Sequence, residues 1–271
     1  MDLSRRSGVI TGAGSGIGRQ LAFALAERGA SLFLVGRRQG ALDATAERVA
    51  ELGGTAHAFT ADLTVGSAIT EVADAARERL GAIDLLINNA GNVRAGRLED
   101  TDEHDIHAMF NLNLVAPILL TRSLLPDLRK AASERHSLLL GVSSGIALVA
   151  LPFYTTYAAT KSGLAAFDHA LRRELFGSGV HVATVYPGAT ETDMMRSSDA
   201  GDSFGFGRRP VADVVEEILA AIERDEHEIN TALPNRRLLQ ELHKTAPLDV
   251  DAALAPRLNE LEAAVRNHRS I

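Results

Sequence analysis

The sequence has no cysteine and no tryptophan, and aromatic residues make up only 4% of its 271 positions. Without cysteine, disulfide bridges and thiolate metal sites are excluded and a reducing compartment is permitted, and we expect no metal site of another kind. Hydrophobic residues reach 46%, which is ample for a sizeable core. Because rings are scarce, alanine, leucine and valine are expected to fill that core.

The chain also lacks a positive charge surplus and a long apolar run, and we expect no signal peptide. Its formal net charge is −7, so it has no electrostatic footprint for nucleic acid. No run approaches the roughly 18 apolar residues of a membrane span. Arg5 and Arg6 are followed by the glycine-rich stretch Gly8–Gly18 instead of an apolar signal segment. We therefore expect a soluble cytoplasmic protein with no nucleic-acid partner and no membrane span.

Four glycines in seven residues follow the first predicted strand, Val9–Thr11. They form the run Gly12-Ala13-Gly14-Ser15-Gly16-Ile17-Gly18, and an amphipathic helix with Leu21 and Leu25 comes next. A strand, a glycine-rich turn and a helix in this order expose backbone N–H groups at the helix N-terminus, where they bind a phosphate. The spacing is Gly-x-x-x-Gly-x-Gly, not the commoner Gly-x-Gly-x-x-Gly. We interpret the run as a dinucleotide loop in preference to an ordinary tight turn.

The second predicted strand, Ser31–Val35, ends in Gly36-Arg37-Arg38. An NAD-binding loop normally has an acidic residue about 20 positions beyond its glycines, which accepts from the ribose 2′-OH. Arg37 and Arg38 stand there instead, and two guanidinium groups suit bidentate binding of a 2′-phosphate. They could also be solvated surface arginines. The missing acid favours NADP(H) over NAD(H).

Two further strand ends carry polar or small residues. Asp62-Leu63 follows the predicted strand Ala56–Thr60, where the aspartate either meets an adenine or caps a helix that starts near Ser67. Asn88-Asn89-Ala90-Gly91 follows the predicted strand Ile83–Ile87, where these residues either permit the close approach of a ligand or make a turn. The sequence leaves both pairs of alternatives open.

A helical pattern over residues 102–113 continues through Leu114–Leu125 with Pro117 inside it. Proline removes one bond of the helical ladder and can kink the helix. Asn113 lies four residues before Pro117. A side-chain amide at a kink can hold a water molecule, although most mid-helix asparagines are merely tolerated.

A tyrosine and a lysine share the predicted helix 155–176. Tyr157 and Lys161 are four residues apart and therefore lie on one face. Ser144 stands thirteen residues before the tyrosine, just after the predicted strand Ser137–Val142. A phenol beside an ammonium group, with a hydroxyl close by, suits proton transfer to or from an alcohol or carbonyl oxygen. The Tyr-x-x-x-Lys spacing alone also occurs by chance.

Three segments bear on the substrate. The loop 145–153 is almost wholly apolar, and 189–210 has little periodicity but carries Met194, Met195, Phe204 and Phe206. A stretch of that length without secondary structure is usually functional or disordered, and we interpret 189–210 as a substrate lid over an apolar pocket. Alternatively, both segments pack against the C-terminal region or a neighbouring subunit. Residues 234–271 show two more helical patterns, the second broken near Pro256, and form a C-terminal helical extension.

Strands and helices alternate along the whole chain, and no repeat or linker divides it. The sixth predicted strand, Val180–Val185, leads into Tyr186-Pro187-Gly188, and Glu228–Thr231 could be a seventh. The alternation predicts an α/β fold with a doubly wound, Rossmann-like parallel sheet of about seven strands and helices on both faces, in one domain over 1–271. Ligands bind at the carboxyl ends of such strands, and every candidate residue lies there or on the element that follows.

These motifs, in this order, resemble those of the short-chain dehydrogenase/reductase family in its compact single-domain branch. The resemblance spans about residues 7–232 and includes Thr11-Gly-x-x-x-Gly16-x-Gly18, Asp62, Asn88-Asn-Ala-Gly91, Asn113, Ser144, Tyr157-x-x-x-Lys161 and Pro187-Gly188 with Thr192. Thr190 stands where the family often has a valine. The resemblance implies nothing for 234–271.

The resemblance implies a role for each matched residue. Tyr157 would be the catalytic acid/base, Lys161 would lower its pKa and hold the nicotinamide ribose, and Ser144 would position the substrate oxygen. Asn113 would hold a water that continues the proton relay. The implied cofactor-binding residues are Gly12, Gly14, Ser15, Gly16, Ile17, Gly18, Arg37, Arg38, Asp62, Leu63, Asn89, Ala90, Gly91, Tyr157, Lys161, Pro187, Gly188, Thr190 and Thr192, with Arg37 on the 2′-phosphate and Thr192 on the carboxamide.

A tyrosine that acts as a base near neutral pH needs a lowered pKa. Its reference pKa is ~10, so a base at pH 7 calls for about three units, or ~4 kcal/mol. A charge at ~4 Å with an effective dielectric of ~20 supplies about that much. Lys161 together with an oxidised nicotinamide is therefore sufficient in principle.

The predicted function is that of an NADP-dependent oxidoreductase, which transfers a hydride between nicotinamide and a medium-sized apolar carbonyl or secondary alcohol. The alternative is a cofactor-binding sensor or scaffold without turnover, against which the complete set of Ser144, Tyr157 and Lys161 argues. A related epimerase or dehydratase ranks last, because the chain lacks the extra substrate domain those usually carry. By resemblance, we expect a homodimer or homotetramer formed through the helices near 102–125 and 155–176.

Overall fold

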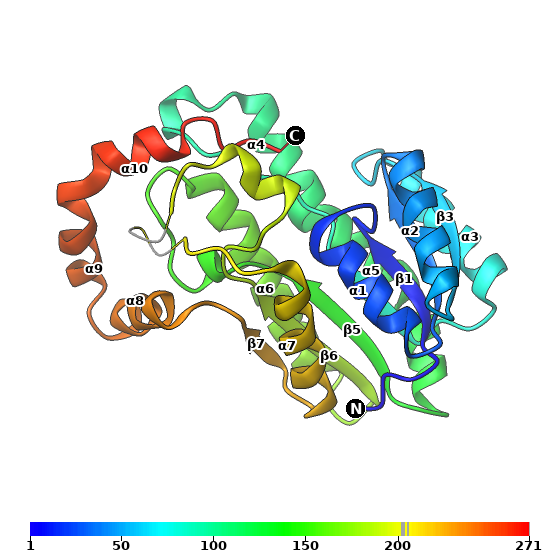
Figure 1. Ribbon diagram of the computed structural model, residues 1–271. Coiled ribbons are helices and arrows are strands. Elements are labelled where there is room, and N and C mark those ends of the chain that lie inside the picture. The colour runs from blue at the N-terminus through cyan, green and yellow to red at the C-terminus, as the bar shows by residue number, and fades with distance from the viewer. Residues whose placement is uncertain (202–203, 205, 271) are drawn as a thin grey trace.

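The computed structural model describes residues 1–201, 204 and 206–270, which contain one seven-stranded sheet (Figure 1). All strands are parallel, in the order β3-β2-β1-β4-β5-β6-β7. The strands are β1 Ser7–Thr11, β2 Ser31–Gly36, β3 Thr55–Thr60, β4 Leu85–Asn88, β5 Ser137–Val142, β6 Val180–Tyr186 and β7 Glu228–Asn230. The order runs outward in both directions from β1, which is the doubly wound arrangement. The predicted fold class is confirmed.

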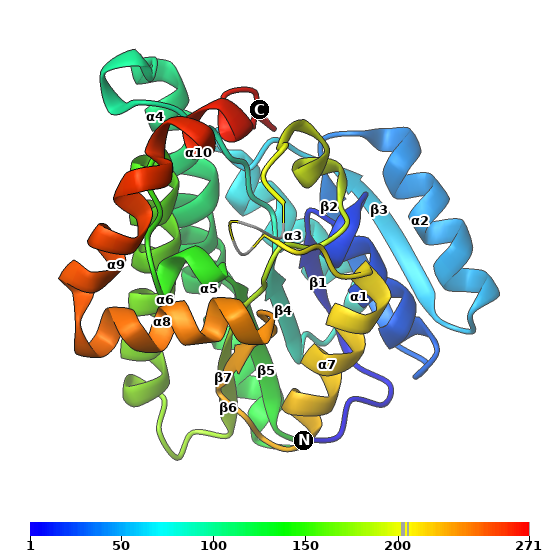
Figure 2. The ribbon, with the colours of Figure 1, turned by 60° about the vertical axis from the view of Figure 1, so that its left-hand side comes forward.

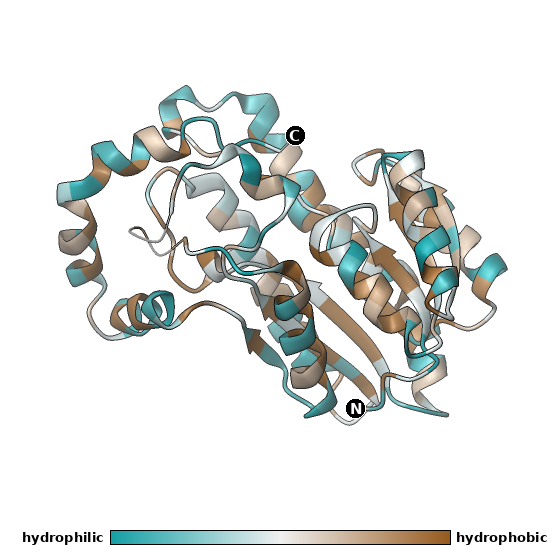
Figure 3. Cartoon of the chain, in the orientation of Figure 1, coloured by the Kyte–Doolittle hydropathy of each residue, from teal (hydrophilic) through white to brown (hydrophobic). Residues whose placement is uncertain are grey.

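Helices cover both faces of the sheet because the inner strands are apolar on both sides (Figures 2 and 3). On β2, Leu32 and Leu34 pack into the cluster with α1, α2 and α7, whereas Phe33 and Val35 pack into the cluster with α3, α5 and α6. The first group comprises α1 Gly16–Ala26, α2 Gln39–Glu51 and α7 Val211–Glu223, and the second comprises α3 Ala68–Leu80, α5 Ala116–Ala132 and α6 Thr155–Glu174.

The helical stretch around Pro117 is interrupted as predicted, but by a π-helical turn. Helix α4 covers Glu103–Phe110, the π-turn covers Asn111–Val115, and α5 follows with Pro117 in its first turn. These three segments form one continuous helical stretch from Glu103 to Ala132, so Pro117 lacks the N–H that would pair with the carbonyl of Asn113 in an α-helix. The widened turn therefore falls just before Pro117 and contains Asn113.

The stretch Glu103–Ala132 is long and apolar enough to cross a membrane by length and composition. Leu120, Leu124 and Leu128 on α5 are nevertheless fully buried in the cluster beneath α3 and the sheet. A core helix passes the same test of length and composition, and α5 has the contacts of one.

The C-terminal region forms three α-helices that curve around the segment before residue 201 (Figures 1 and 2). They are α8 Pro234–Thr245, α9 Pro247–Leu254 and α10 Leu258–Val265, with a 3-10 turn at Ala255–Arg257. The two predicted helical patterns and the break of the second near Pro256 are confirmed, and the boundary between the two patterns, which the sequence did not locate, falls at Ala246. The amide of Asp199 donates to the carbonyl of Ala264 at 2.9 Å, and that of Ser270 donates to Val93 at 3.0 Å. These bonds fix the extension to the rest of the domain.

Candidate active site

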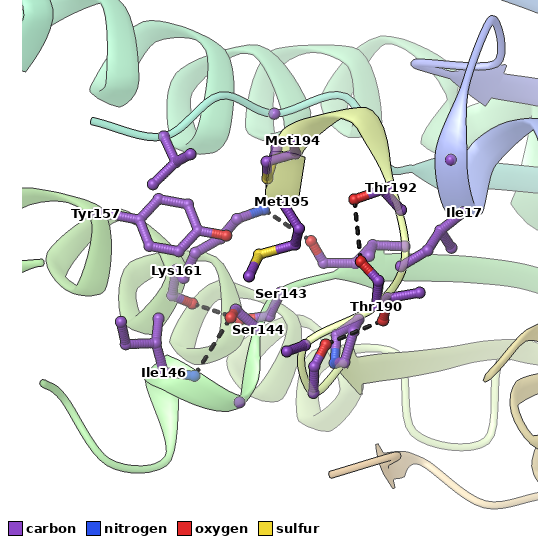
Figure 4. Close-up of a pocket in the computed structure, with 18 of the residues that line it drawn as sticks. Ile17, Ser143, Ser144, Ile146, Tyr157, Lys161, Thr190, Thr192, Met194 and Met195 are labelled. Atoms are coloured by element: carbon purple, nitrogen blue, oxygen red, sulfur yellow. Dashed lines mark hydrogen bonds between the residues drawn. The ribbon is translucent and has the colours of Figure 1, made fainter. Parts of the chain in front are cut away.

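A cavity of about 230 Å³ lies at the carboxyl edge of the sheet, where β1, β4, β5 and β6 end (Figure 4). The structure brings together there most of the residues predicted from the sequence: Gly12, Ser15, Gly16, Ile17, Asn89, Ala90, Gly91, Ser144, Tyr157, Lys161, Pro187, Gly188, Thr190 and Thr192. They come from segments up to 180 residues apart. The topology of the sheet is what makes them neighbours.

The other predicted residues lie outside this cavity: Gly14, Gly18, Arg37, Arg38, Asp62, Leu63 and Asn113. A Cβ on Gly14 would lie 3.2 Å from the Cβ of Ala41, so this glycine serves the packing of α2. Arg37 and Arg38 are exposed at the end of β2. Leu63 is buried in the core cluster of α3, so the prediction that its side chain belongs to the cofactor site is not supported by its contacts.

The glycine loop has the shape that a dinucleotide site requires. Gly12 and Gly16 have φ values of 66° and 52°, a region that favours glycine. Ser15 is the N-cap of α1 but makes no side-chain capping bond. Ser15, Gly16 and Ile17 therefore present the start of the helix to the cavity, and backbone N–H groups at a helix start bind phosphates.

Asn89 holds the glycine loop from the neighbouring strand end. Its Nδ2 donates to the carbonyls of Thr11 at 2.9 Å and Gly12 at 3.3 Å, while Thr11 Oγ1 accepts from the amides of Asn89 and Ala90. A Cβ on Gly18 would lie 2.4 Å from this Nδ2, so only glycine fits. The sequence left a turn or ligand contact open for this motif. The side chain of Asn89 serves the loop, and Asn89, Ala90 and Gly91 also line the cavity.

Asp62 caps a local turn. Its Oδ1 accepts from the backbone N of Thr64 at 3.0 Å and from the hydroxyl of Thr64 at 2.7 Å. Burial raises the pKa of Asp62, but the bonds from Thr64 and the charge of Arg37 outweigh it and bring the pKa below its ordinary value. The proposed capping of the next helix is wrong, because α3 begins at Ala68 with Ser67 as its N-cap.

The side chain of Asn113 is occupied by protein partners. Its Oδ1 accepts from the amide of Asn92 at 2.8 Å, and its Nδ2 donates to the Asn92 carbonyl at 2.9 Å and to Thr160 Oγ1 at 3.1 Å. The predicted water-holding role does not fit a side-chain amide with these bonds. Its main-chain carbonyl is the remaining candidate, because Pro117 lacks the N–H that would pair with it in an α-helix.

Tyr157 points its hydroxyl into the cavity, between Ser144 and Met195 (Figure 4). The ring is 9% exposed, and burial raises the pKa of Tyr157 to about 12, although a hydrogen bond with Ser144 opposes this. Ser144 Oγ also accepts from the amide of Ile146 at 3.3 Å, which fixes its rotamer. The phenol is therefore protonated at neutral pH.

Lys161 lies behind the tyrosine ring. Its Nζ is 6.0 Å from the ring centroid of Tyr157 and donates to the carbonyl of Val142 at 2.9 Å. Burial lowers the pKa of Lys161 to about 8, with Asp168 opposing the change. The expectation that Lys161 lowers the pKa of Tyr157 from about 4 Å is not met in the chain itself, where burial of the phenol dominates.

The cavity has an apolar wall, as predicted. The loop 145–153 contributes fewer residues to this wall than predicted. Gly145 and Ile146 line the cavity, together with Met194, Met195 and Phe206 from the predicted lid. Val149, Leu151 and Phe153 are not part of the lining. Leu151 and Phe153 instead pack in a cluster with Leu261 and Val265 of α10, as the alternative interpretation proposed.

The lining residues that were not predicted include three with polar side chains, Tyr154, Arg236 and His268. Tyr154 OH and His268 Nδ1 are 2.7 Å apart, and His268 Nε2 lies 3.1 Å from the carbonyl of Met194. A carbonyl only accepts, so Nε2 carries the proton and Tyr154 donates to Nδ1. Little in the sequence indicated Arg236 and His268, because the family resemblance includes no motif in residues 234–271.

Comparison with known proteins gives a concordant result. A family model described as "short chain dehydrogenase" matches residues 7–203. The ketoacyl reductase HetN of Nostoc sp. is 35% identical over 186 residues, which is 69% of this chain and 64%, less than two thirds, of that relative. Among solved structures, a short-chain dehydrogenase from Sphingobium yanoikuyae in complex with NADPH is 28% identical, covers 98% of both chains and has a TM-score of 0.76. The bulky-bulky ketone specific alcohol dehydrogenase from Comamonas testosteroni is 28% identical, with 88% of this chain and 90% of that chain covered and a TM-score of 0.73.

Proposed function

The chain belongs to the short-chain dehydrogenase/reductase family of oxidoreductases, and on that premise we propose that it is an NADP-dependent reductase of ketones with Tyr157 as its acid/base. One observation carries the proposal: Ser144, Tyr157 and Lys161 line the same cavity as the N-terminal turn of α1. A protein that only bound a nucleotide would have no use for a buried phenol, hydroxyl and amine at that point.

The residues of the cavity fit a nicotinamide dinucleotide. The start of α1 is the candidate site for the pyrophosphate, and the strand ends at Asn89–Gly91 and Pro187–Gly188 lie farther along the same cavity. A Cβ on Gly91 would lie 3.3 Å from Lys161 Nζ, so the glycine leaves room next to the amine. When bound, such a cofactor supplies or accepts the hydride.

The protein handles the proton. With its pKa raised to about 12 by burial, Tyr157 holds a proton at neutral pH and can donate it to the oxygen of a carbonyl that becomes an alcohol. Ser144 is positioned to bind that same oxygen, since its hydroxyl interacts with Tyr157. These states support reduction as the favoured direction.

The two arginines after β2 support NADP. Within the described residues, Arg37 and Arg38 are exposed and make no ion pair, so their guanidinium groups remain available to an anion. Gly36 pairs in register with Thr60, which brings the ends of β2 and β3 together beside the glycine loop. A 2′-phosphate at this edge would meet two cations and no acid of β2.

Arg37→Asp should weaken or reverse the preference for NADPH over NADH. We expect NADPH binding to weaken about tenfold or more, because an attraction becomes a repulsion, while NADH binding changes by less than about threefold. Dissociation constants from titration of cofactor fluorescence measure both effects. Arg48→Asp, an exposed arginine near the end of α2, is the matched control. Equal losses for both cofactors would show that Arg37 does not recognise the 2′-phosphate.

The apolar wall supports a ketone with a hydrophobic body. Ile146, Met194, Met195 and Phe206 line the cavity into which the tyrosine hydroxyl points, and methionine adapts to substrates of irregular shape. Two similar proteins are named for ketoacyl reduction and for specificity toward bulky ketones. A panel of aryl and alkyl ketones with NADPH tests the proposal. If the protein binds NADPH tightly but no ketone of the panel causes NADPH oxidation, the alternative of a cofactor-binding sensor or scaffold without turnover would be favoured instead.

We also propose that the protein is a cytoplasmic homodimer or homotetramer. Val115 and Leu119, on the predicted interface helix, are 41% and 40% exposed although both are large and apolar. Light scattering after gel filtration gives the oligomeric state directly, and a monomer at micromolar concentration would contradict this part of the proposal.

A further inference from the structure

The proposed substrate end of the cavity contains a buried cation that has no counter-ion among the described residues. Arg236, at the start of α8, is only 7% exposed and lines the cavity. Its Nη2 donates to the carbonyl of Val149 at 3.1 Å, and its guanidinium group lies 5.8 Å from the ring centroid of Phe206. Its Nη1 is buried and has no hydrogen-bond partner in the described part of the chain.

No carboxylate of the described residues pairs with this guanidinium group. The carboxylate that lines the same cavity, Asp193, is paired with Arg196 at 3.1 Å and its side chain is 50% exposed at the rim. By contrast, the most deeply buried arginine, Arg6, has Asp84 at 3.2 Å. Arg236 is thus buried to a similar degree without the partner that buried charges normally have.

Tyr154 and His268, which line the same cavity, are neutral. Burial lowers the pKa of His268 to about 4, and the hydrogen bonds described above fix the uncharged ring between Tyr154 and Met194. Burial raises the pKa of Tyr154, with a small opposing effect from Arg236, so the phenol keeps its proton. Arg236 itself remains protonated at neutral pH, because burial lowers its pKa only to about 10.

A guanidinium group that lines a cavity and has no carboxylate partner among the described residues is suited to bidentate binding of a carboxylate. We propose that Arg236 binds a carboxylate on the substrate, so that the protein reduces an apolar keto acid whose ketone lies at Tyr157 and whose acid group lies at Arg236. This inference rests on the proposed function and names its substrate class. The apolar residues between the two ends, Met195 and Phe206 among them, would contact the hydrocarbon that joins ketone and acid.

The experiment compares each acid with its own neutral form. The substrates are phenyl keto acids with one to five methylene groups between ketone and carboxylate, and the corresponding primary amides, all with NADPH. In the wild type we expect the best acid to have a KM at least about tenfold below that of its amide, because the amide cannot form the charged pair. Equal KM values across the series would overturn the inference.

Three variants separate recognition from structure. Arg236→Met should raise the KM of the acid about tenfold or more and leave that of the amide within about twofold, and Arg236→Lys should recover part of the loss. Arg196→Met, which removes an exposed arginine at the rim, should change neither value. An equal loss for acid and amide in Arg236→Met, with unchanged NADPH affinity, would mean that Arg236 only supports the cavity and would contradict the proposal.

A binding measurement keeps this inference distinct from the proposed function. If no ketone of either series is reduced, the proposed function fails. Calorimetric titration of the acids and amides into the NADPH-saturated wild type then still tests Arg236. If the wild type binds an acid more tightly than its amide and Arg236→Met does not, the carboxylate site is supported. If the wild type binds acids and amides equally, the inference is overturned.

Discussion

Lys161 shares α6 with a second buried ionisable residue, Asp168. The carboxyl group of Asp168 is fully buried, accepts from Thr184 Oγ1 at 3.1 Å and lies against Gly141 of β5. Burial raises the pKa of Asp168 to about 7, with Thr184 and Lys161 opposing the rise. The lysine and the aspartate therefore titrate within the range in which the enzyme would work, and their charges are coupled.

This coupling predicts a pH dependence. Burial brings the pKa of Lys161 down to about 8. If the reaction needs the charged lysine, kcat/KM should have its full value below pH 8 and should fall as the pH rises through 8. Asp168→Asn keeps the acceptor for Thr184 but removes the negative charge that holds the pKa of Lys161 up. The alkaline limb of kcat/KM should move to lower pH by about half a unit to one unit.

Glu174→Gln, an exposed carboxylate near the end of the same helix, is the control and should leave the profile unchanged. A profile in Asp168→Asn identical to that of the wild type would show that the aspartate does not influence the lysine.

Single residues also show where sequence reasoning ends. Tyr157, Lys161 and Ser144 were predicted to converge, because motif order in an alternating fold determines which strand ends meet. Arg236 was not predicted, since nothing in its immediate sequence distinguishes it from a solvated arginine. Its burial results from the position of α8 over the cavity. The occupied amide of Asn113 was missed for a similar reason, since its partner Asn92 is known only from the packing.

At the scale of elements, the glycine loop is held to its shape by contacts from β4. Gly18→Ala should disturb it, because the added Cβ would lie 2.4 Å from Asn89 Nδ2 and 2.6 Å from the carbonyl of Gly12. We expect a loss of about 1–3 kcal/mol in the free energy of unfolding and a tenfold or greater loss in NADPH affinity. Denaturant unfolding and fluorescence titration measure the two effects.

Gly40→Ala is the matched control for this substitution. Gly40 lies in the first turn of α2 with nothing within 4 Å of its added Cβ. Alanine there should be neutral or stabilise the protein by up to about 1 kcal/mol, with unchanged NADPH affinity. Wild-type NADPH affinity in Gly18→Ala would contradict the account of the loop.

Element types were largely predictable, and element ends were not. Apolar runs and glycine stops determined the strands and the helices between them, because both signals are local. The π-turn at Asn111–Val115 and the start of α9 at Pro247 depend on how the chain continues and packs. For the same reason the interruption was predicted at Pro117 itself, whereas the π-turn lies just before it.

At the scale of the whole molecule, the chain after β7 contributes Arg236 and His268 to the cavity, at the end that we propose binds the substrate. The amide of Ala95 donates to the carbonyl of His268 at 3.0 Å, and Arg97 makes two bonds of 2.7 and 2.6 Å to Glu262. Leu261 of α10 is 1% exposed in the cluster that also contains Tyr157. The extension should therefore matter for the substrate and little for the cofactor, whose glycine loop is built from β1 and α1.

Leu261→Ala tests this division. Removal of a buried leucine should lower the free energy of unfolding by about 2–5 kcal/mol and raise the KM of the best ketone several-fold, while the NADPH dissociation constant stays within about twofold. Leu258→Ala, on the same helix but 37% exposed, should change stability by less than about 1 kcal/mol. A Leu261→Ala protein with unchanged KM would show that α10 does not shape the substrate end.

The central claim is that Tyr157 transfers the proton in a cofactor-dependent reduction. The most direct test measures NADPH binding and turnover in Tyr157→Phe, with NADPH fluorescence followed without interference from tryptophan, which the chain lacks. The account predicts an NADPH dissociation constant within about twofold of the wild type and a kcat at least 100-fold lower, because the general acid is gone. A phenylalanine variant that reduces the same ketone at the wild-type rate would contradict it.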